Sequence, residues 1–218
     1  EALRPERRER LASLLSAAER QRHDAYRLAD DRQRFLLGRG GLRLLLGAWL
    51  GLAPQAVPIE TGPHGKPHCP IGPCFNVSHS GDLILLALHP LQAVGVDVER
   101  LRPELDWLPI ARRMLSESEC QQLEALPETE RPAAFLAAWC RLEARLKARG
   151  DGLGGLERLR EQELRAERSV PGETAGAALS PSPGPDREGW TANVERLWDV
   201  TVPAGYRAAI ALAGSAAT

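Results

Sequence analysis

The chain has 218 residues, of which 43% are hydrophobic and 26% are charged, and its formal net charge is −1 at pH 7. These values are ordinary for a globular protein with one large or two small cores, and such a balanced charge gives no indication of nucleic acid or an anionic membrane as a partner. No stretch reaches the roughly 20 apolar residues of a membrane-spanning helix. No secretory signal is visible either, so we expect a cytoplasmic protein that binds neither nucleic acid nor a membrane.

The beginning of the chain predicts helices. Residues 6–22 combine leucine and alanine with dense charge, which is typical of a solvated amphipathic helix, and Arg22 lies on its charged face. Asp30 or Asp31 is placed to cap a second helix that runs to about Leu50.

Prolines and glycines then follow one another through residues 54–73, which predicts a restricted loop with at most a short strand around 57–60. Gly65 and Lys66 lie in this loop, and they form an ordinary turn unless an anion lies over them. Of the 28 basic residues only Lys66 and Lys147 are lysines. A compact ammonium is not replaceable by arginine where it must lie against a phosphate, so both lysines are candidate phosphate ligands.

Two strands are predicted next, at residues 83–88 and 93–98, joined by a short turn as an antiparallel hairpin. His79 precedes them, between Ser78 and Ser80. It either satisfies backbone groups at a strand end or binds phosphate. A Ser–His catalytic pair is the weakest alternative, because adjacent residues on a strand point to opposite faces.

Asp97 and Glu99 end the second of these strands. Their i, i+2 spacing directs both carboxylates to one face of a strand. Two such charges repel each other by about 4 kcal/mol at an intermediate dielectric constant, which a bound cation or a basic neighbour relieves. The alternative is a strand end whose carboxylates point into water, assisted by Arg100 and Arg102.

Helical patterns return in the second half, and Ser116 with Glu119 forms a predicted capping box. The last long helix is expected to end at Gly150. A composition rich in Gly, Pro, Ser and Ala predicts a flexible loop near residues 169–189. The expected helices are 110–115, 116–126 and 131–149, and the expected closing strands are 194–202 and 206–212.

Glu143 and Lys147 lie at i and i+4 on the last long helix, so they share one face. Such a pair is a common surface device of helices. The same spacing also suits a carboxylate and an ammonium of a phosphate site, and the residues alone leave both alternatives open. The helix-then-hairpin order occurs twice, which indicates a duplicated α+β protein with halves 1–100 and 101–218.

Taken together, these segments resemble the 4′-phosphopantetheinyl transferase superfamily, in its longer, monomeric, surfactin-synthetase-activating type. Residues 95–99 match the family pattern G-[IV]-D-x-E, and residues 139–147 match W-[SCT]-x-K-E-[AS]-x-x-K except at Leu142. Residues 65–67 and 75–81 are similar to two further family blocks.

The resemblance implies an α+β fold, a pseudo-twofold duplication of an antiparallel sheet packed against helices, with coenzyme A between the halves. It implies transfer of the 4′-phosphopantetheine arm from coenzyme A to a serine of an apo acyl or peptidyl carrier protein, with release of adenosine 3′,5′-bisphosphate. The enzyme would be a monomer, with Mg²⁺ as its metal and Mn²⁺ as a substitute.

The resemblance also implies roles for single residues. Asp97, Glu99 and Glu143 would hold the metal. Lys147 would neutralise a pyrophosphate oxygen, and Glu143 would accept the proton of the serine hydroxyl. The residues expected to contact coenzyme A are Arg22, Gly65, Lys66, Asn76, Ser78, His79, Asp97 and Lys147.

Leu142 departs from the family pattern, which has a lysine at this position. Either Arg141 supplies the missing charge or one pyrophosphate contact is absent. Two other functions use the same residues: a Mg²⁺-dependent hydrolase of a pyrophosphate-containing cofactor, and a non-catalytic protein that binds coenzyme A or a carrier protein.

Overall fold

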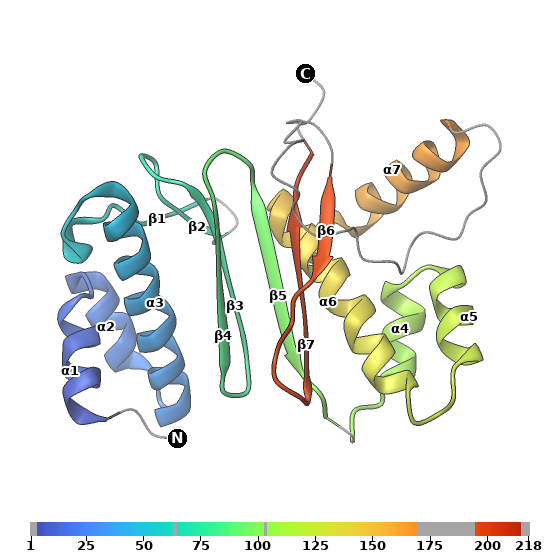
Figure 1. Ribbon diagram of the computed structural model, residues 1–218, viewed down its shortest axis with the longest axis horizontal. Coiled ribbons are helices and arrows are strands. Elements are labelled where there is room, and N and C mark those ends of the chain that lie inside the picture. Colours follow the sequence, from blue (N-terminus) through green and yellow to red (C-terminus); the bar gives the residue numbers. More distant parts are fainter. Residues whose placement is uncertain (1–3, 63–64, 103, 170–194, 215–218) are drawn as a thin grey trace.

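The computed structural model describes residues 4–62, 65–102, 104–169 and 195–214. Strands occupy the middle of the molecule and helices cover them on two sides, with the helices of residues 5–50 at one end and those of residues 108–149 at the other (Figure 1). The fold is mixed α+β with antiparallel sheets packed against helices, as the sequence predicts. The predicted loop near 169–189 lies almost wholly outside the described residues.

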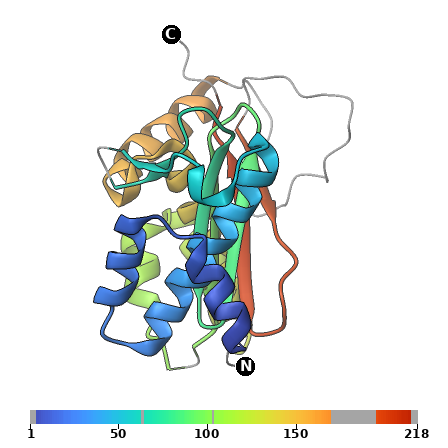
Figure 2. The same ribbon diagram turned by 90° about the vertical axis from the view of Figure 1, so that its left-hand side faces the viewer.

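The first helices are α1 (Pro5–Ser13), α2 (Ala17–Ala25) and α3 (Ala29–Leu50). The prediction of one helix over 6–22 is therefore wrong, because Ser16 and Glu19 form a capping box that starts α2. Helix α3 begins after Leu28, so Asp30 and Asp31 lie in its first turn and do not cap it. Figure 2 shows these helices in front of the strands.

Behind α3 lie two short strands, β1 (Glu60–Thr61) and β2 (Pro67–His68), and a longer antiparallel pair, β3 (Cys74–Ser80) and β4 (Leu83–His89). Helix α3 packs on the longer pair, and the core between them includes Leu42, Leu46 and Phe75. Gly41 of α3 lets it approach Leu86 closely, since a Cβ atom there would lie 3.3 Å from Cδ1 of Leu86.

The other sheet contains β5 (Val94–Arg100), β7 (Tyr206–Leu212) and β6 (Arg196–Asp199), in the order β5–β7–β6 with antiparallel neighbours. The closing pair of strands is confirmed. The prediction that β5 forms a hairpin with β4 is wrong, since β5 pairs with β7, more than a hundred residues later. The division into halves 1–100 and 101–218 remains a prediction, although this sheet joins the last strand of the first half to the second.

The second half begins with α4 (Leu108–Met114), α5 (Glu117–Ala125) and α6 (Arg131–Arg149). The predicted capping box of α5 and the glycine end of α6, at Gly150 with φ 80°, are both confirmed. Residues 153–167, charged and without clear periodicity, include most of α7 (Leu156–Ser169). No helix in the described part of the chain is long and apolar enough to cross a membrane.

Two faces of α6 are buried. One carries large side chains, including Phe135, Leu142 and Leu146, which pack against α4 and α5. The other carries only small ones: Cys140, Ala144 and Ala148 lie against Ala209 and Ala211 of β7. Small residues on both sides let the helix backbone come very close to the sheet.

Candidate active site

The closest approach of α6 to the sheet is at Gly95 of β5. A Cβ atom at this glycine would lie 2.0 Å from the carbonyl oxygen of Ala144 and 2.3 Å from the backbone nitrogen of Ala148. Only a glycine allows such contact. Because Asp97 follows Gly95 by two residues, its side chain points to the same side of β5 and faces Lys147 of α6.

The Asp97 carboxylate is buried and binds two groups through one oxygen. Its Oδ1 accepts hydrogen bonds from Nζ of Lys147 at 2.6 Å and from Oγ of Ser78 at 2.9 Å. The side chain is 4% exposed. Its other oxygen, Oδ2, is buried and has no hydrogen-bond partner among the residues that the structure describes. A buried carboxylate oxygen left in this way is costly unless a ligand completes it.

Glu99 has a similar environment one step along the strand. Its Oε2 accepts a hydrogen bond from Oγ of Ser80 at 2.7 Å, and Ser80 belongs to the neighbouring strand β3. Asp97 and Glu99 thus both contact serines of β3, as the i, i+2 spacing predicts for two side chains on one face.

Glu143 lies on α6 within the electrostatic influence of these carboxylates. Burial raises the pKa of the Glu143 carboxyl above its usual value. The charge of Lys147 opposes that shift, and the negative charges of Asp97 and Glu99 add to it. The structure therefore brings Asp97 and Glu99 of β5 into one region with Glu143 and Lys147 of α6, although Glu99 and Glu143 are 44 residues apart in the sequence.

The region has no ready-made metal cage. Within the described ranges, no group of three or more His, Cys, Asp or Glu side chains is arranged to hold a metal ion. The chemistry of the donors nevertheless fits a hard cation: the carboxylates repel one another, and Oδ2 of Asp97 has no partner among the described groups. The ammonium of Lys147 neutralises Asp97 in the structure. The metal-ligand roles of Asp97, Glu99 and Glu143 stay predictions.

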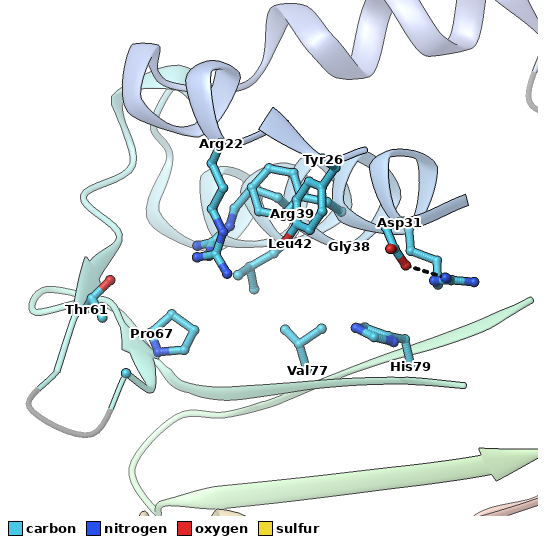
Figure 3. Close-up of a pocket in the computed structure, with 13 residues that line it drawn as sticks. Arg22, Tyr26, Asp31, Gly38, Arg39, Leu42, Thr61, Pro67, Val77 and His79 are labelled. Atoms are coloured by element: carbon cyan, nitrogen blue, oxygen red, sulfur yellow. Dashed lines mark hydrogen bonds and ion pairs between the residues drawn. The ribbon is translucent and has the colours of Figure 1, made fainter. Parts of the chain in front are cut away.

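A cavity of about 500 Å³ lies on the other side of β3, between this strand, helices α2 and α3, and the β1–β2 loop. Figure 3 shows Arg22, Arg39 and His79 around it, from three different elements. Its apolar wall includes Phe35 and Val77. A cavity that combines guanidinium groups with apolar groups suits a flat, anionic ligand.

Three of the predicted coenzyme A contacts line this cavity: Arg22, Gly65 and His79. Asn76 and Ser78 lie outside its lining because side chains alternate along β3, and Asp97 and Lys147 lie outside it because they belong to β5 and α6. His79 and Val77 face the cavity, while Asn76 and Ser78 face β5. This alternation also places His79 and Ser78 on opposite sides of the strand, which disfavours a Ser–His pair, as expected.

Lys66 makes contacts that the sequence does not indicate. Its Nζ donates hydrogen bonds to the carbonyl oxygens of Lys147, at the end of α6, and of Val94, at the start of β5. Burial lowers the pKa of the Lys66 ammonium, and Cys74 opposes this shift. Lys66 thus ties the β1–β2 loop to both elements of the acidic site, and its predicted contact with coenzyme A stays a prediction.

Leu142, where the family pattern has lysine, points away from the acidic site. It is buried in the core between α6 and α4–α5, close to Phe135 and Leu146. The adjacent Arg141 forms a two-pronged pair with Asp199 of β6, with Nε 2.8 Å from Oδ1 and Nη2 2.5 Å from Oδ2. Arg141 is therefore engaged elsewhere and is a poor replacement for the missing lysine.

Sequence reasoning missed Arg34, Phe35 and Arg39, which line the cavity from α3. The guanidinium carbons of Arg22 and Arg39 lie 5.4 Å and 6.0 Å from the centre of the Phe35 ring, so one ring supports both cations. Burial lowers the pKa of Arg39, and Glu19, with an oxygen 3.5 Å from Nε, opposes this. The i, i+3, i+4 spacing of Phe35, Gly38 and Arg39 was the available signal.

Comparison with known proteins identifies the family of the chain. The model of the 4′-phosphopantetheinyl transferase superfamily matches residues 93–192, and the model of the N-terminal part of 4′-phosphopantetheinyl transferases matches residues 4–91. The chain belongs to the 4′-phosphopantetheinyl transferase superfamily. Its acidic site lies in the part that the superfamily model matches, and much of its arginine-lined cavity in the other.

Several curated members of the superfamily are similar to the chain. It is 37% identical over 154 residues to 4′-phosphopantetheinyl transferase HetI of Nostoc sp., over 68% of this chain and 65% of HetI. It is 39% identical over 147 residues to a putative 4′-phosphopantetheinyl transferase, slr0495, of Synechocystis sp., over 66% of this chain and 60% of the relative. For Sfp of Bacillus subtilis the identity is 31% over 153 residues, with 69% and 67% covered. The chain thus spans slightly less than two thirds of the first two relatives.

Proposed function

We propose that the protein transfers the 4′-phosphopantetheine arm of coenzyme A to a serine hydroxyl of an apo acyl or peptidyl carrier protein. The observation that carries this proposal is the buried Asp97 carboxylate, which faces Lys147 and has one oxygen free of hydrogen bonds to the described residues. A phosphate-transfer site needs this combination of an anchor for a cation and a compact positive charge. The family membership and the arginine-lined cavity support the same activity.

The cavity suits the adenosine end of coenzyme A. Its guanidinium groups, from Arg22 and Arg39, would pair with the 3′-phosphate, and its apolar wall at Phe35 and Val77 would contact the base. The pyrophosphate would then lie toward the acidic site across β3. This arrangement would hold one end of the substrate in place and orient the reacting phosphorus.

Asp97, Glu99 and Glu143 would hold a Mg²⁺ ion, which when bound withdraws charge from the pyrophosphate oxygens. The ammonium of Lys147 lies beside Asp97 and supplies a second positive charge for the negative charge that develops in phosphoryl transfer. The serine oxygen of the carrier protein forms a bond to the phosphorus that bears the pantetheine arm. The bond from this phosphorus to adenosine 3′,5′-bisphosphate breaks.

Glu143 is suited to accept the serine proton. Burial raises its pKa, and the charges of Asp97 and Glu99 act in the same direction against the charge of Lys147. Without a cation, a raised pKa makes this carboxylate a stronger base than an ordinary glutamate, and a Mg²⁺ ion bound beside it would oppose the shift. The monomeric state and the cytoplasmic location expected from the sequence stay predictions.

The decisive experiment incubates the protein with Mg²⁺, coenzyme A and an apo carrier protein. A carrier that gains the mass of one phosphopantetheine arm supports the transferase. Adenosine 3′,5′-bisphosphate without modified carrier would instead indicate a hydrolase. Unchanged coenzyme A that nevertheless binds to the protein would indicate a non-catalytic member.

We expect the Asp97→Ala variant to lose transfer activity by about 100-fold or more, since it removes both the cation anchor and the partner of Lys147. The measurement is the rate of carrier modification at saturating coenzyme A. Asp199→Ala is a suitable control, because it also deprives a basic residue of α6, Arg141, of its carboxylate partner but lies on β6. Full activity of Asp97→Ala would contradict the proposed site.

A further inference from the structure

Strands β3 and β5 lie side by side but belong to different sheets. They are joined by hydrogen bonds from the backbone N–H groups of β5 to side-chain oxygens of β3: Val96 to Asn76 at 3.0 Å, Val98 to Ser78 at 3.3 Å and Arg100 to Ser80 at 3.0 Å. We call these three residues of β3 the polar seam. The partners are 20 positions apart in each case, so the two strands run parallel in constant register.

The two serines of the polar seam do more than join the strands. Each also donates its hydroxyl proton to a carboxylate of β5: Ser78 to Asp97 at 2.9 Å and Ser80 to Glu99 at 2.7 Å. A hydroxyl has one proton to donate. Because the N–H of β5 already donates to Oγ, the hydroxyl proton of each serine is directed to the carboxylate.

We propose that Ser80 is a positioning residue that fixes the Glu99 carboxylate for binding a divalent cation. The bond to Oε2 restricts rotation of the carboxylate and so presents Oε1 in one direction. The backbone N–H of Arg100 donates to the serine oxygen in turn. Ser80 is therefore held by β5 at its oxygen and holds the Glu99 carboxylate of the same strand through its proton. This inference rests on the proposed function for the metal-binding role of Glu99.

Ser80 also has an ordinary structural role, the acceptance of the Arg100 N–H. The experiment must therefore distinguish two effects of removing the hydroxyl: weaker attachment of β5 to β3, and a change in the orientation of the Glu99 carboxylate. The protein offers a matched control at Ser116, which accepts a hydrogen bond from the N–H of Glu119 at 3.2 Å and donates to the Glu119 carboxylate at 2.7 Å. The same three groups are present there, but at the start of α5.

The measurement is the dissociation constant of Mn²⁺ in the presence of coenzyme A, obtained from the electron paramagnetic resonance signal of free Mn²⁺. A sample without protein corrects for the metal that coenzyme A binds by itself. We expect Ser80→Ala to raise this constant about tenfold, as removal of a hydrogen bond to a metal ligand generally does. Ser116→Ala should leave it unchanged although it lowers the melting temperature.

Two further comparisons test the route through Glu99. In a Glu99→Gln background, Ser80→Ala should cause no additional loss of Mn²⁺ affinity, because the residue through which it acts is already changed. Ser80→Thr should keep the wild-type constant and Ser80→Val should not, since this pair differs only in the hydroxyl. The Thr and Val pair also serves if Ser80→Ala does not fold.

In the transfer assay, Ser80→Ala should raise the Mg²⁺ concentration for half-maximal rate and leave kcat at saturating Mg²⁺ nearly unchanged. The inference would be overturned if Ser80→Ala left the Mn²⁺ dissociation constant unchanged, or if it lowered the Mn²⁺ affinity equally in the wild-type and Glu99→Gln backgrounds. A wild-type protein that binds no Mn²⁺ would also overturn it. A wild-type protein that binds Mn²⁺ but does not modify a carrier would contradict only the proposed function. The Mn²⁺ constants of the variants would then still decide the role of Ser80.

Discussion

Leu142 shows how a single position can mislead when it is considered without its surroundings. The sequence presents it as a lysine missing from the phosphate site. In the structure its side chain belongs to the helical core of α4, α5 and α6. The acidic site lies on another face of α6, so the leucine is explained by packing and not by loss of a contact.

Leu142→Lys is therefore expected to destabilise the protein by about 3 kcal/mol, since it removes a buried apolar group and places an ammonium in its position. Transfer activity should not rise. Thermal unfolding and the carrier assay measure both effects, with Leu142→Met as a control that keeps the apolar volume. A lysine variant as stable as the wild type and more active would show that the side chain reaches the phosphate site.

A second residue, Glu19, holds α2 against α3. Its carboxylate accepts hydrogen bonds from the Ser16 backbone and from Nε of Arg43, a buried arginine that also binds the carbonyl oxygens of Pro54 and Val57. Burial alone would raise the pKa of Glu19, but these hydrogen bonds and the charges of Arg43 and Arg39 lower it below its usual value.

Because the pKa of Glu19 is lower in the folded than in the unfolded protein, its stabilisation is present above the unfolded pKa, near 4.5, and is lost as the pH falls through the folded value. We expect Glu19→Gln to cost about 2 kcal/mol at pH 7, as expected for hydrogen bonds to a charged group. The cost should shrink below about pH 4.5. Denaturant unfolding of both proteins across this range measures it, and a cost independent of pH would contradict the ion pair.

At the scale of elements, the site depends on how closely α6 approaches β5. Gly95 has no side chain and Ala144 and Ala148 have only methyl groups, so the backbones of β5 and α6 come into contact. Lys147 and Glu143 lie beside these alanines on the helix, so the small-residue contact sets the distance between the ammonium and the Asp97 carboxylate.

Gly95→Ala should force α6 away from β5, because its Cβ would lie 2.0 Å from a backbone oxygen that cannot move alone. We expect a loss of about 3 kcal/mol in the free energy of unfolding and a large loss of transfer activity. Gly154→Ala is the control, since a Cβ there meets nothing within 4 Å. A Gly95→Ala protein with wild-type stability would show that the helix can shift without cost.

For the whole molecule, the polar seam is one connection between the β3–β4 pair and the sheet of β5, β7 and β6, beside the apolar cluster of Ala87, Val94, Val96 and Leu212. Asn76 of the seam accepts a hydrogen bond from the N–H of the buried Val96, and unlike the two serines it binds no carboxylate among the described residues. Asn76→Ala would leave this N–H unpaired and should destabilise the protein by about 2 kcal/mol. Hydrogen exchange should become faster at Val96 and Val98 before it changes in α4 and α5. Uniformly faster exchange would indicate general unfolding instead.

Local features of the sequence predicted much of this architecture. The capping box at Ser116, the helix end at Gly150 and the shared face of Asp97 and Glu99 all depend on neighbours within a few residues, and the structure confirms them. The same kind of signal, Ser16 with Glu19, was overlooked, and the two helices it separates were predicted as one.

The features that sequence reasoning missed involve partners distant along the chain. β5 pairs with β7 and not with its neighbour β4, and Lys66 donates to a carbonyl group 81 residues away. The side chains of a strand do not determine which other strand it pairs with, so the proximity of β4 and β5 in the sequence led to the incorrect prediction of a hairpin. Arg39 is a different case: its contact with Phe35 lies within one helical turn and was available as a signal, and only its ion pair with Glu19 joins it to another helix.

The polar seam also bears on how the chain can be divided. The two family models meet at the turn between β4 and β5, at residues 91 and 93. Strand β3 lies before this turn and β5 after it, and the two strands are joined by side-chain hydrogen bonds and not by a backbone ladder. These side-chain contacts help to align the two parts. Co-expressed fragments 1–91 and 92–218 would still carry every hydrogen-bonding group of the seam. Lys66 and the apolar cluster of Ala87, Val94, Val96 and Leu212 would add further contacts between the fragments.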